Sequence, residues 1–250
     1  MTRLYSPELK KVIFFDMNRT LLDPQQSFRD SFHETLQEYT GRWQQNDAFS
    51  PEKVFQAYTE QWQKQRRAKK NTKVPLEQIR LACLTHAFQP LPIPNKERFL
   101  RTFWQQTKSK QDQSPRLFKD VRETLEQLSD KSYKLAIISN GSKPKQEQQL
   151  KLLKLQSLIP EQHLFSSQQG GVRKPNPQIF RHALQTLRIP AAQAIMVGDS
   201  WNNDIVGAVS SGMDAIWIRP LHNHKQSPQR KLGSRQVMII RHFSELNSLL

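Results

Sequence analysis

Seven polar residues, spread over four segments of the chain, have side chains suited to binding a phosphate group and a metal ion. They are Asp16, Asn18, Ser139, Asn140, Lys174, Asp199 and Asp204. A carboxylate can attack phosphorus as a nucleophile, and Mg²⁺ prefers a few oxygen ligands with water completing its octahedron. An aspartate after a strand is often only a cap or turn residue. All four segments occurring together and in this order indicate a phosphate and metal site far more strongly than any one of them does.

Short apolar runs predict the strands that would position these residues. The runs are 12–15, 135–138, 163–166, 194–197, 215–218 and 237–240. Helical patterns lie between the later runs, at 143–155, 177–187 and 202–211. Strands that alternate with helices indicate a Rossmann-like α/β fold, in which helices cover both faces of a parallel sheet.

The candidate residues lie where such a sheet binds ligands. Right-handed crossovers bring the carboxyl ends of parallel strands to one edge, and open α/β sheets bind their ligands there. Asp16, Ser139 and Asp199 all come at the ends of apolar runs, so we expect them to converge at this edge. Lys174 lies on the loop after the third run, from which its side chain can reach the same place.

The gap between the first two apolar runs is far longer than one crossover connection needs. It contains four groups of apolar and aromatic residues at helical spacing. The groups begin at Phe28, Val54, Ile79 and Phe99. Prolines, which the first helical turn tolerates, lie near three of the starts: Pro51, Pro75 and Pro94. We predict an all-helical cap domain at 26–114, with the aromatic stripes as its core, and an α/β core domain at 1–25 and 115–250.

The charge of the chain favours anionic ligands. Its formal net charge is +16, which steers anions toward it without selecting among them. The densest basic cluster is 64–70, and a second one spreads over 219–241. A solvated helix face with a basic tail explains this pattern, and so does binding to nucleic acid or to an acidic partner. The pair His222 and His224 is a weak metal candidate, because no cysteine or carboxylate lies nearby.

Cysteine usage and hydropathy predict a cytoplasmic protein. Cys83 is the only cysteine and lies in a helical apolar pattern, so we expect a core thiol and no intrachain disulfide. No stretch approaches the roughly 20 apolar residues that span a bilayer. The N-terminal residues do not have the pattern of a signal peptide. Membrane partners are therefore not expected, and the sequence gives no indication of the oligomeric state.

The four segments together resemble the motifs of the haloacid dehalogenase (HAD) superfamily, in its branch with a helical cap inserted after the first strand. The resemblance covers nearly the whole chain. Its motifs are Asp16 after the first strand and the segments 135–142, 173–177 and 198–204. The last two are similar to the forms found in phosphatases of the superfamily. The resemblance implies that Asp16 is a nucleophile that forms an aspartyl-phosphate.

The resemblance also implies roles for the other candidates, with Mg²⁺ as the cofactor. The residues implied in metal binding are Asp16, Asn18 through its backbone carbonyl, Asp199 and Asp204. The residues implied in phosphate binding are Ser139, Asn140 and Lys174. Lys174 would neutralise Asp16 and the phosphate, and the Ser139 hydroxyl with nearby N–H groups would hold the phosphoryl oxygens.

Two residues depart from the phosphatase pattern. Phosphatases that the chain resembles carry a second aspartate two residues after the nucleophile, where this chain has Asn18. An amide cannot exchange a proton at neutral pH, and general acid–base catalysis supplies roughly 10²–10⁴-fold. Arg19 replaces a glycine that is usual at this turn; its bulk could distort the loop, or its charge could replace part of the phosphate clamp.

The sequence favours a Mg²⁺-dependent phosphatase, slowed by Asn18, that acts on a small phosphorylated metabolite. A different class of function is a non-catalytic protein that binds a phosphorylated ligand or nucleic acid on a HAD scaffold. Dehalogenation is a weaker alternative, because Gly198-Asp199-Ser200 favours a metal that halide displacement does not need. Phosphonate cleavage would need a Schiff-base lysine, for which Lys53 and Lys64 are available without being marked.

Overall fold

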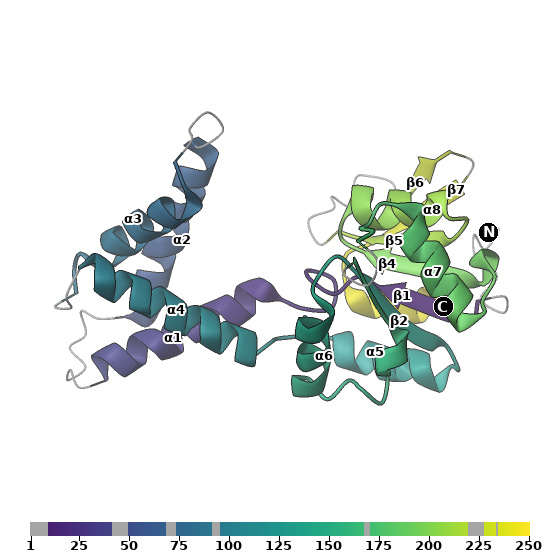
Figure 1. The fold of residues 1–250 in the computed structure, drawn as a ribbon, viewed down its shortest axis with the longest axis horizontal. Helices are drawn as coiled ribbons and strands as arrows, with labels where there is room; N and C mark the ends of the chain where they lie inside the picture. The colour runs from purple at the N-terminus through teal and green to yellow at the C-terminus, as the bar shows by residue number, and fades with distance from the viewer. Residues whose placement is uncertain are drawn as a thin grey trace. The chain divides into compact units, whose positions relative to one another are not determined.

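The computed structural model describes residues 10–41, 50–68, 74–91, 96–167, 171–219, 228–233 and 235–250. The chain divides into two compact units. The α/β unit consists of Met1–Pro24 and Pro115–Leu250, and the helical unit consists of Gln25–Ser114. The helical unit is thus an insertion that follows the first strand of the α/β unit (Figure 1).

The described part of the α/β unit contains one seven-stranded sheet with the order β3-β2-β1-β4-β5-β7-β6. Its strands are β1 Val12–Phe15, β2 Lys134–Ser139, β3 Leu164–Ser166, β4 Ala194–Gly198, β5 Asp214–Ile218, β6 Gln229–Leu232 and β7 Arg235–Ile240. All neighbouring strands are parallel except β6 and β7, which are antiparallel. The structure confirms the predicted α/β class and a strand at each of the six apolar runs.

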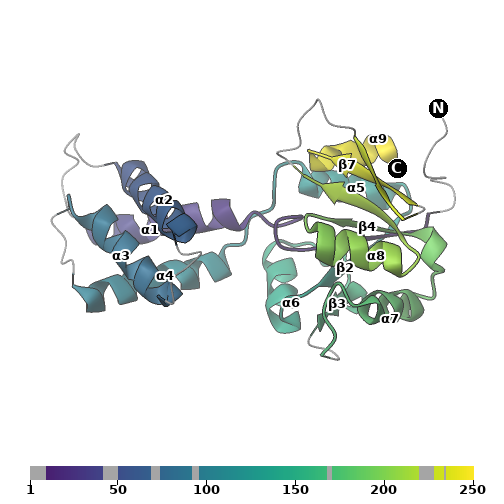
Figure 2. The same ribbon diagram turned by 90° about the horizontal axis from the view of Figure 1, so that it is seen from above.

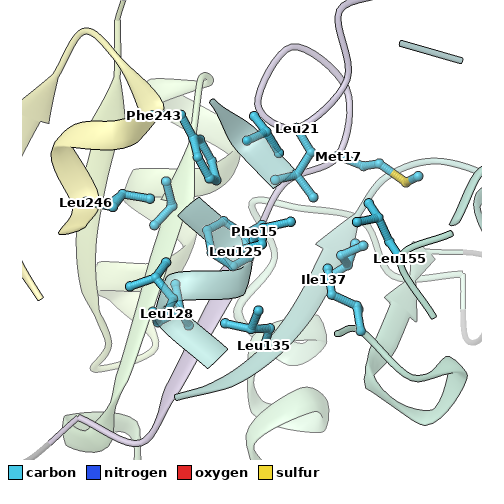
Figure 3. Close-up of a cluster of buried hydrophobic side chains, with 14 of the residues drawn as sticks. Phe15, Met17, Leu21, Leu125, Leu128, Leu135, Ile137, Leu155, Phe243 and Leu246 are labelled. Atoms are coloured by element: carbon cyan, nitrogen blue, oxygen red, sulfur yellow. The ribbon is translucent and has the colours of Figure 1, made fainter. Parts of the chain in front are cut away.

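Helices cover both faces of this sheet (Figure 2). They are α5 Val121–Asp130, α6 Lys143–Leu152, α7 Pro177–Leu187, α8 Gly207–Ser210 and α9 Leu246–Leu249. Successive side chains of a strand point to opposite faces. Phe15 therefore packs in the core that contains Leu125 of α5 and Phe243 (Figure 3). Phe14 packs on the other face, in the core that contains Phe180 of α7.

Helices α5 and α9 and strand β6 of the α/β unit were not predicted from the sequence. Helix α5 buries Val121, Leu125 and Leu128 at helical spacing, a pattern that lies just before the second apolar run and was overlooked. Strand β6 has the sequence Gln-Arg-Lys-Leu, which shows no apolar alternation. It lies at the edge of the sheet, paired with β7 only, where charged residues are common because they discourage further strand pairing.

The helices near the candidate site differ in length from their predictions. Helix α7 has the predicted bounds and begins with Asn176 as its cap, whose side chain accepts a hydrogen bond from the Gln178 N–H. Helix α6 ends at Leu152 rather than at residue 155. The helix predicted at 202–211 is a π-helical turn, Trp201–Val206, that continues into α8.

The helical unit has four described helices: α1 Pro24–Thr40, α2 Pro51–Ala68, α3 Leu76–Phe88 and α4 Glu97–Gln113. Its aromatic stripes form a core, as expected. Phe103 is fully buried and packs against Phe32 and Phe88, with ring centroids 5.1 and 4.8 Å apart. Cys83 is a buried free thiol in the same core. Burial raises its pKa to about 11, so the thiol is unreactive at neutral pH.

Prolines mark two of the predicted helix starts. Pro51 is the first residue of α2, and Pro75 directly precedes α3. Pro94, the pair His222 and His224, and the last two residues of the basic cluster 64–70 lie outside the described residues. Within the described ranges, no helix is long and apolar enough to cross a membrane.

Candidate active site

The carboxyl ends of three neighbouring strands bring the predicted site residues together. Strand β1 lies between β2 and β4, and all three run parallel. Asp16 follows β1, Ser139 is the last residue of β2, and Asp199 follows β4. These ends surround a pocket of about 220 Å³. It is lined by Asp16, Asn18, Arg19, Ser139, Asn140, Gly141, Lys174, Asp199, Ser200, Asn203 and Asp204.

Lys174 connects the two most deeply buried carboxylates of the pocket. Its Nζ donates to Asp16 Oδ1 at 2.7 Å and to Asp204 Oδ1 at 2.6 Å. The third donor bond goes to the backbone carbonyl of Ile138 at 2.6 Å, near the end of β2. The lysine is only 4% exposed. All three ammonium protons are therefore used, and the nitrogen is held in one position between the carboxylates.

The electrostatics of this group leave one carboxyl easy to protonate. Burial raises the pKa of Asp16 to about 6; the Lys174 charge opposes this effect and the Asp204 charge adds to it. For Lys174, burial would lower the pKa, but the charges of Asp16 and Asp204 outweigh it and hold the pKa above its ordinary value. Two carboxylates thus share one ammonium, which leaves a net negative charge that favours a further cation.

Three carboxylates could hold that cation. Asp16, Asp199 and Asp204 each offer an oxygen, and these oxygens all lie within 4.8 Å of one another. Burial also raises the pKa of Asp199, partly countered by Arg19. A donor set made only of oxygen atoms fits a hard cation such as Mg²⁺ better than a softer transition metal. The residues present are therefore suited to the ion that the sequence led us to expect.

Both carboxylate oxygens of Asp204 accept hydrogen bonds from other residues that line the pocket. While Oδ1 accepts from Lys174, Oδ2 accepts from the Ser200 N–H at 2.9 Å. The Ser200 hydroxyl in turn caps the π-helical turn by accepting from the Asn203 N–H at 3.3 Å. A Cβ on Gly198 would lie 2.4 Å from Asp204 Oδ2. The glycine at the end of β4 therefore makes room for the Asp204 carboxylate.

Asn140 has a contact that the sequence did not indicate. Its side-chain Nδ2 donates to the Lys174 carbonyl at 3.0 Å, and its Oδ1 accepts from the Lys174 N–H at 2.8 Å. This pair of bonds fixes the main chain of the loop that carries the lysine. The side-chain amide of Asn140 is thus engaged in positioning Lys174, and phosphate binding by Asn140 through its backbone N–H stays a prediction.

Two further residues that were missed position the Asp199 loop. Thr20 is fully buried, and its Oγ1 accepts from the Asp199 N–H at 3.1 Å. The indole of Trp217, in β5, donates from Nε1 to the Asp199 carbonyl at 2.8 Å. No local sequence signal identifies either contact, because each joins residues that are far apart in the chain.

Asn18 and Arg19, the two departures from the phosphatase pattern, both line the pocket. Arg19 has φ +66, a left-handed conformation that glycine adopts more easily than residues with a side chain. The turn nevertheless forms: the Arg19 N–H donates to the Leu22 carbonyl at 2.9 Å. The Arg19 Nε lies 3.1 Å from Asp199 Oδ2, and its side chain is 67% exposed. The turn thus forms with Arg19 in a left-handed conformation, and the Arg19 charge pairs with Asp199.

The fold and the site define a class: a Rossmann-like α/β protein with an aspartate after its first strand and a lysine that bridges it to a second acid. A family model described as haloacid dehalogenase-like hydrolase matches residues 13–218, well over half of the chain. The protein belongs to this family.

Known proteins resemble the chain in sequence and in fold. It is 32% identical over 135 residues to glyceraldehyde 3-phosphate phosphatase from Methanothermobacter thermautotrophicus, covering 54% of this chain and 59% of that relative. The chain spans about half the length of the curated relatives it matches.

Solved structures agree in fold alone. The HAD-hydrolase YfnB from Bacillus subtilis has a TM-score of 0.57 at 20% identity, over 96% of this chain and 98% of that one. L-2-haloacid dehalogenase from Xanthobacter autotrophicus has a TM-score of 0.56 at 19% identity, over the same shares.

Proposed function

We propose that the protein is a phosphatase that acts on a small phosphorylated metabolite through an aspartyl-phosphate on Asp16. The observation that carries this proposal is the position of Lys174, which is buried and donates to both Asp16 and Asp204. The ammonium offsets part of the carboxylate charge, and a cation held by Asp16, Asp199 and Asp204 would offset more of it, so that a phosphate anion could enter. The phosphatase names of the curated relatives support a phosphate ester as the substrate.

The reaction has two steps at Asp16. In the first, a carboxylate oxygen of Asp16 attacks phosphorus, and the bond from phosphorus to the ester oxygen breaks. In the second, water attacks the aspartyl-phosphate, which releases inorganic phosphate and restores the carboxylate. Lys174 offsets the negative charge that accumulates in both steps, and the Ser139 hydroxyl holds a phosphoryl oxygen.

A Mg²⁺ ion is proposed as the cofactor. Asp16, Asp199 and the backbone carbonyl of Asn18 would bind it, with Asp204 either as a ligand or beside it. When bound, the ion supplies a positive charge that polarises the phosphoryl group and lowers the repulsion between two anions. A magnesium-bound structure of YfnB, which shares the fold, supports this assignment.

Asn18 restricts which substrates react quickly. The leaving oxygen has no protein acid at this position, so an alkoxide would have to take its proton from water. A leaving group that is stable as an anion does not need one. We therefore propose slow hydrolysis of ordinary alkyl phosphates and faster hydrolysis of activated esters.

The test is hydrolysis of p-nitrophenyl phosphate with Mg²⁺ and after its removal by a chelator. We expect saturable turnover that requires the metal and is lost in Asp16→Asn, which replaces the nucleophile by an amide. The control is Asp23→Asn, the same change at a nearby aspartate that does not line the pocket. Turnover that persists in Asp16→Asn would exclude the proposed nucleophile.

A second candidate function is binding of an anionic polymer such as single-stranded nucleic acid. One observation favours it: a row of side chains in the α/β unit in which two adjacent tryptophans lie between two arginines. The Trp201 and Trp217 ring centroids are 4.9 Å apart. The Arg230 guanidinium lies over Trp201 at 4.2 Å, and that of Arg219 over Trp217 at 4.9 Å. Trp201 follows Ser200 directly, so this basic–aromatic row adjoins the residues that line the pocket.

A further inference from the structure

Gln146 is a buried amide in α6 that does not line the pocket but contacts a residue that does. It is 2% exposed. Its Nε2 donates to Ser139 Oγ at 2.5 Å. The Gly141 N–H also donates to this oxygen, at 3.3 Å. The Ser139 hydroxyl therefore receives two hydrogen bonds from the protein, both from residues that follow it in the chain.

The hydrogen bonds that the Ser139 hydroxyl accepts determine which further hydrogen bond it can make. A serine hydroxyl has one proton to donate and two lone pairs that accept. With both lone pairs occupied by Gln146 and Gly141, the proton cannot point back at either donor. Ser139 lines the pocket. The free direction of its O–H bond is thus the one available to a ligand oxygen.

The surroundings of Gln146 show that this arrangement is built in. A Cβ on Gly141 would lie 2.4 Å from Gln146 Nε2. Only glycine at position 141 therefore leaves room for the Gln146 amide. The other end of the amide, Oε1, is buried and has no hydrogen-bond partner among the described residues. An unsatisfied buried oxygen costs stability, and the bond from Nε2 to Ser139 is what the amide gains in this orientation.

We propose that Gln146 is a positioning residue that keeps the Ser139 hydroxyl turned as a donor toward a bound phosphoryl group. The inference rests on the proposed phosphatase function and adds a residue to it. Gln146 does not touch the ligand; it acts by filling one of the two acceptor positions of Ser139, and the Gly141 N–H fills the other. A reversed amide would have the opposite effect, because its oxygen would accept the Ser139 proton and withdraw it from the pocket.

Three substitutions, made in the whole chain, distinguish the effect of the donor bond from Gln146 from that of the Ser139 hydroxyl itself. Gln146→Met keeps the length of the side chain and removes the donor. Gln146→Glu keeps the shape but offers only acceptors, so it turns the Ser139 proton away from the pocket. Ser139→Ala removes the hydroxyl itself. The matched control is Gln148→Met, the same change at an exposed position of the same helix.

The primary measurement is the Kd of inorganic phosphate by calorimetry in the presence of Mg²⁺. A hydrogen bond to a charged group is worth roughly ten- to hundredfold in affinity, so we expect Ser139→Ala to weaken phosphate binding by about this factor. Gln146→Met should weaken it by a smaller factor and Gln146→Glu by at least as much as Ser139→Ala. Gln148→Met should bind like the wild type.

A double variant then tests whether Gln146 acts through Ser139. In the Ser139→Ala background, Gln146→Met should cause no further loss, because there is no hydroxyl left to orient. An equal loss in both backgrounds would overturn the inference and make Gln146 a packing residue. Phosphate binding by Gln146→Glu at the wild-type level would overturn it as well.

Measurements on the wild-type protein test the proposed phosphatase function separately from the role of Gln146. Wild-type protein that neither binds phosphate nor hydrolyses p-nitrophenyl phosphate would overturn the phosphatase proposal together with this inference. Wild-type activity with unchanged Gln146 variants would overturn the inference alone. Thermal melting of each variant checks folding. If Gln146→Met does not fold, the nearly isosteric Gln146→Glu still decides the outcome through its Kd.

Discussion

At the scale of single residues, position 18 decides which substrates the proposed enzyme can use. Asn18→Asp restores a group that can donate a proton at nearly constant volume. Hydrolysis of alkyl phosphates should then rise by up to about 10²–10⁴-fold, the usual contribution of general acid–base catalysis. Hydrolysis of p-nitrophenyl phosphate should rise less, since nitrophenolate leaves without a proton. Steady-state kcat/KM for both substrates measures the difference.

If the missing acid at position 18 limits the reaction, Asn18→Asp must raise kcat/KM more for alkyl phosphates than for p-nitrophenyl phosphate. Equal, small gains would mean that another residue limits the reaction. Arg19 is the first to examine, because it also lines the pocket and pairs with Asp199. The control is Asn203→Asp, which adds the same charge at another position in the pocket lining and should not produce a substrate-dependent gain.

The raised pKa of Asp16 predicts how stability depends on pH in the metal-free protein. Its pKa is about 6 in the folded chain, against an ordinary value of 3.8. The folded state therefore binds the proton more tightly. The resulting stabilisation is fully present below the ordinary pKa and is lost as pH rises through about 6.

Asp16→Asn removes this dependence because an amide does not titrate. Chemical denaturation in chelator should show the variant gaining stability relative to wild type between pH 4 and pH 7, by on the order of 2–3 kcal/mol. A stability difference that is constant over this range would show that Asp16 titrates near its ordinary pKa.

At the scale of elements, the end of β4 and the π-helical turn must fit together closely. In Gly198→Ala the new Cβ would meet the oxygen, Cβ and Cγ of Asp204 at 2.4 to 2.5 Å. Because Asp204 is buried and bonded to Lys174, we expect it to shift and to pull on that ion pair. Stability should fall by about 1–3 kcal/mol, as for other overpacked sites, and turnover should fall at least tenfold.

The control for Gly198→Ala is a glycine variant that strains the chain elsewhere. Gly233→Ala forces a residue with a side chain into φ +60 but meets nothing within 4 Å. It should cost about 1–2 kcal/mol and leave kcat unchanged. If both variants lost stability and neither lost turnover, the position of Asp204 would not matter for the reaction.

The helical unit depends on its aromatic core. Phe103 is fully buried among Phe32, Phe88 and Tyr39. Phe103→Ala should lower the free energy of unfolding by about 3–5 kcal/mol, the usual cost of a large cavity. Denaturation followed by circular dichroism measures this loss. Phe99→Ala, at a partly buried position of the same helix, should cost less.

At the scale of the whole molecule, the net charge of +16 makes an electrostatic partner testable. If the basic–aromatic row binds single-stranded nucleic acid, the affinity for an oligonucleotide should fall steeply with salt. Arg230→Gln should weaken binding and lower the slope of log K against log salt by about 1. Arg181→Gln removes the same charge from an exposed position of α7 and is the control. Equal effects of both would indicate attraction by net charge without a defined surface.

The sheet was predictable because its signal is local. Buried parallel strands are apolar on both faces, so β1, β2 and β4 stand out as apolar runs without any knowledge of their neighbours. Strand β6 has no such signal, because its sequence is polar and charged and it lies in the sheet through pairing with β7 at the edge. Helix α5 differs from β6, because its apolar residues recur at helical spacing and so give a local signal in the sequence.

The sequence alone determined which chemical groups are available and where they enter the sheet. Asp16 and Asp199 follow strands and Ser139 ends one, and parallel strands end on one edge, so all three were expected at the same edge of the sheet. The identity of Asn18 likewise removes an acid regardless of structure.

Only the tertiary structure decided how these groups are arranged and which others support them. The amide of Asn140 binds the Lys174 main chain 34 residues away, and Thr20 holds the N–H of Asp199 from 179 residues away. Gln146 fills one of the two acceptor positions of Ser139. Such contacts carry no sequence signal, because a hydrogen bond depends on distance and direction in space, and amides and hydroxyls occur throughout any chain.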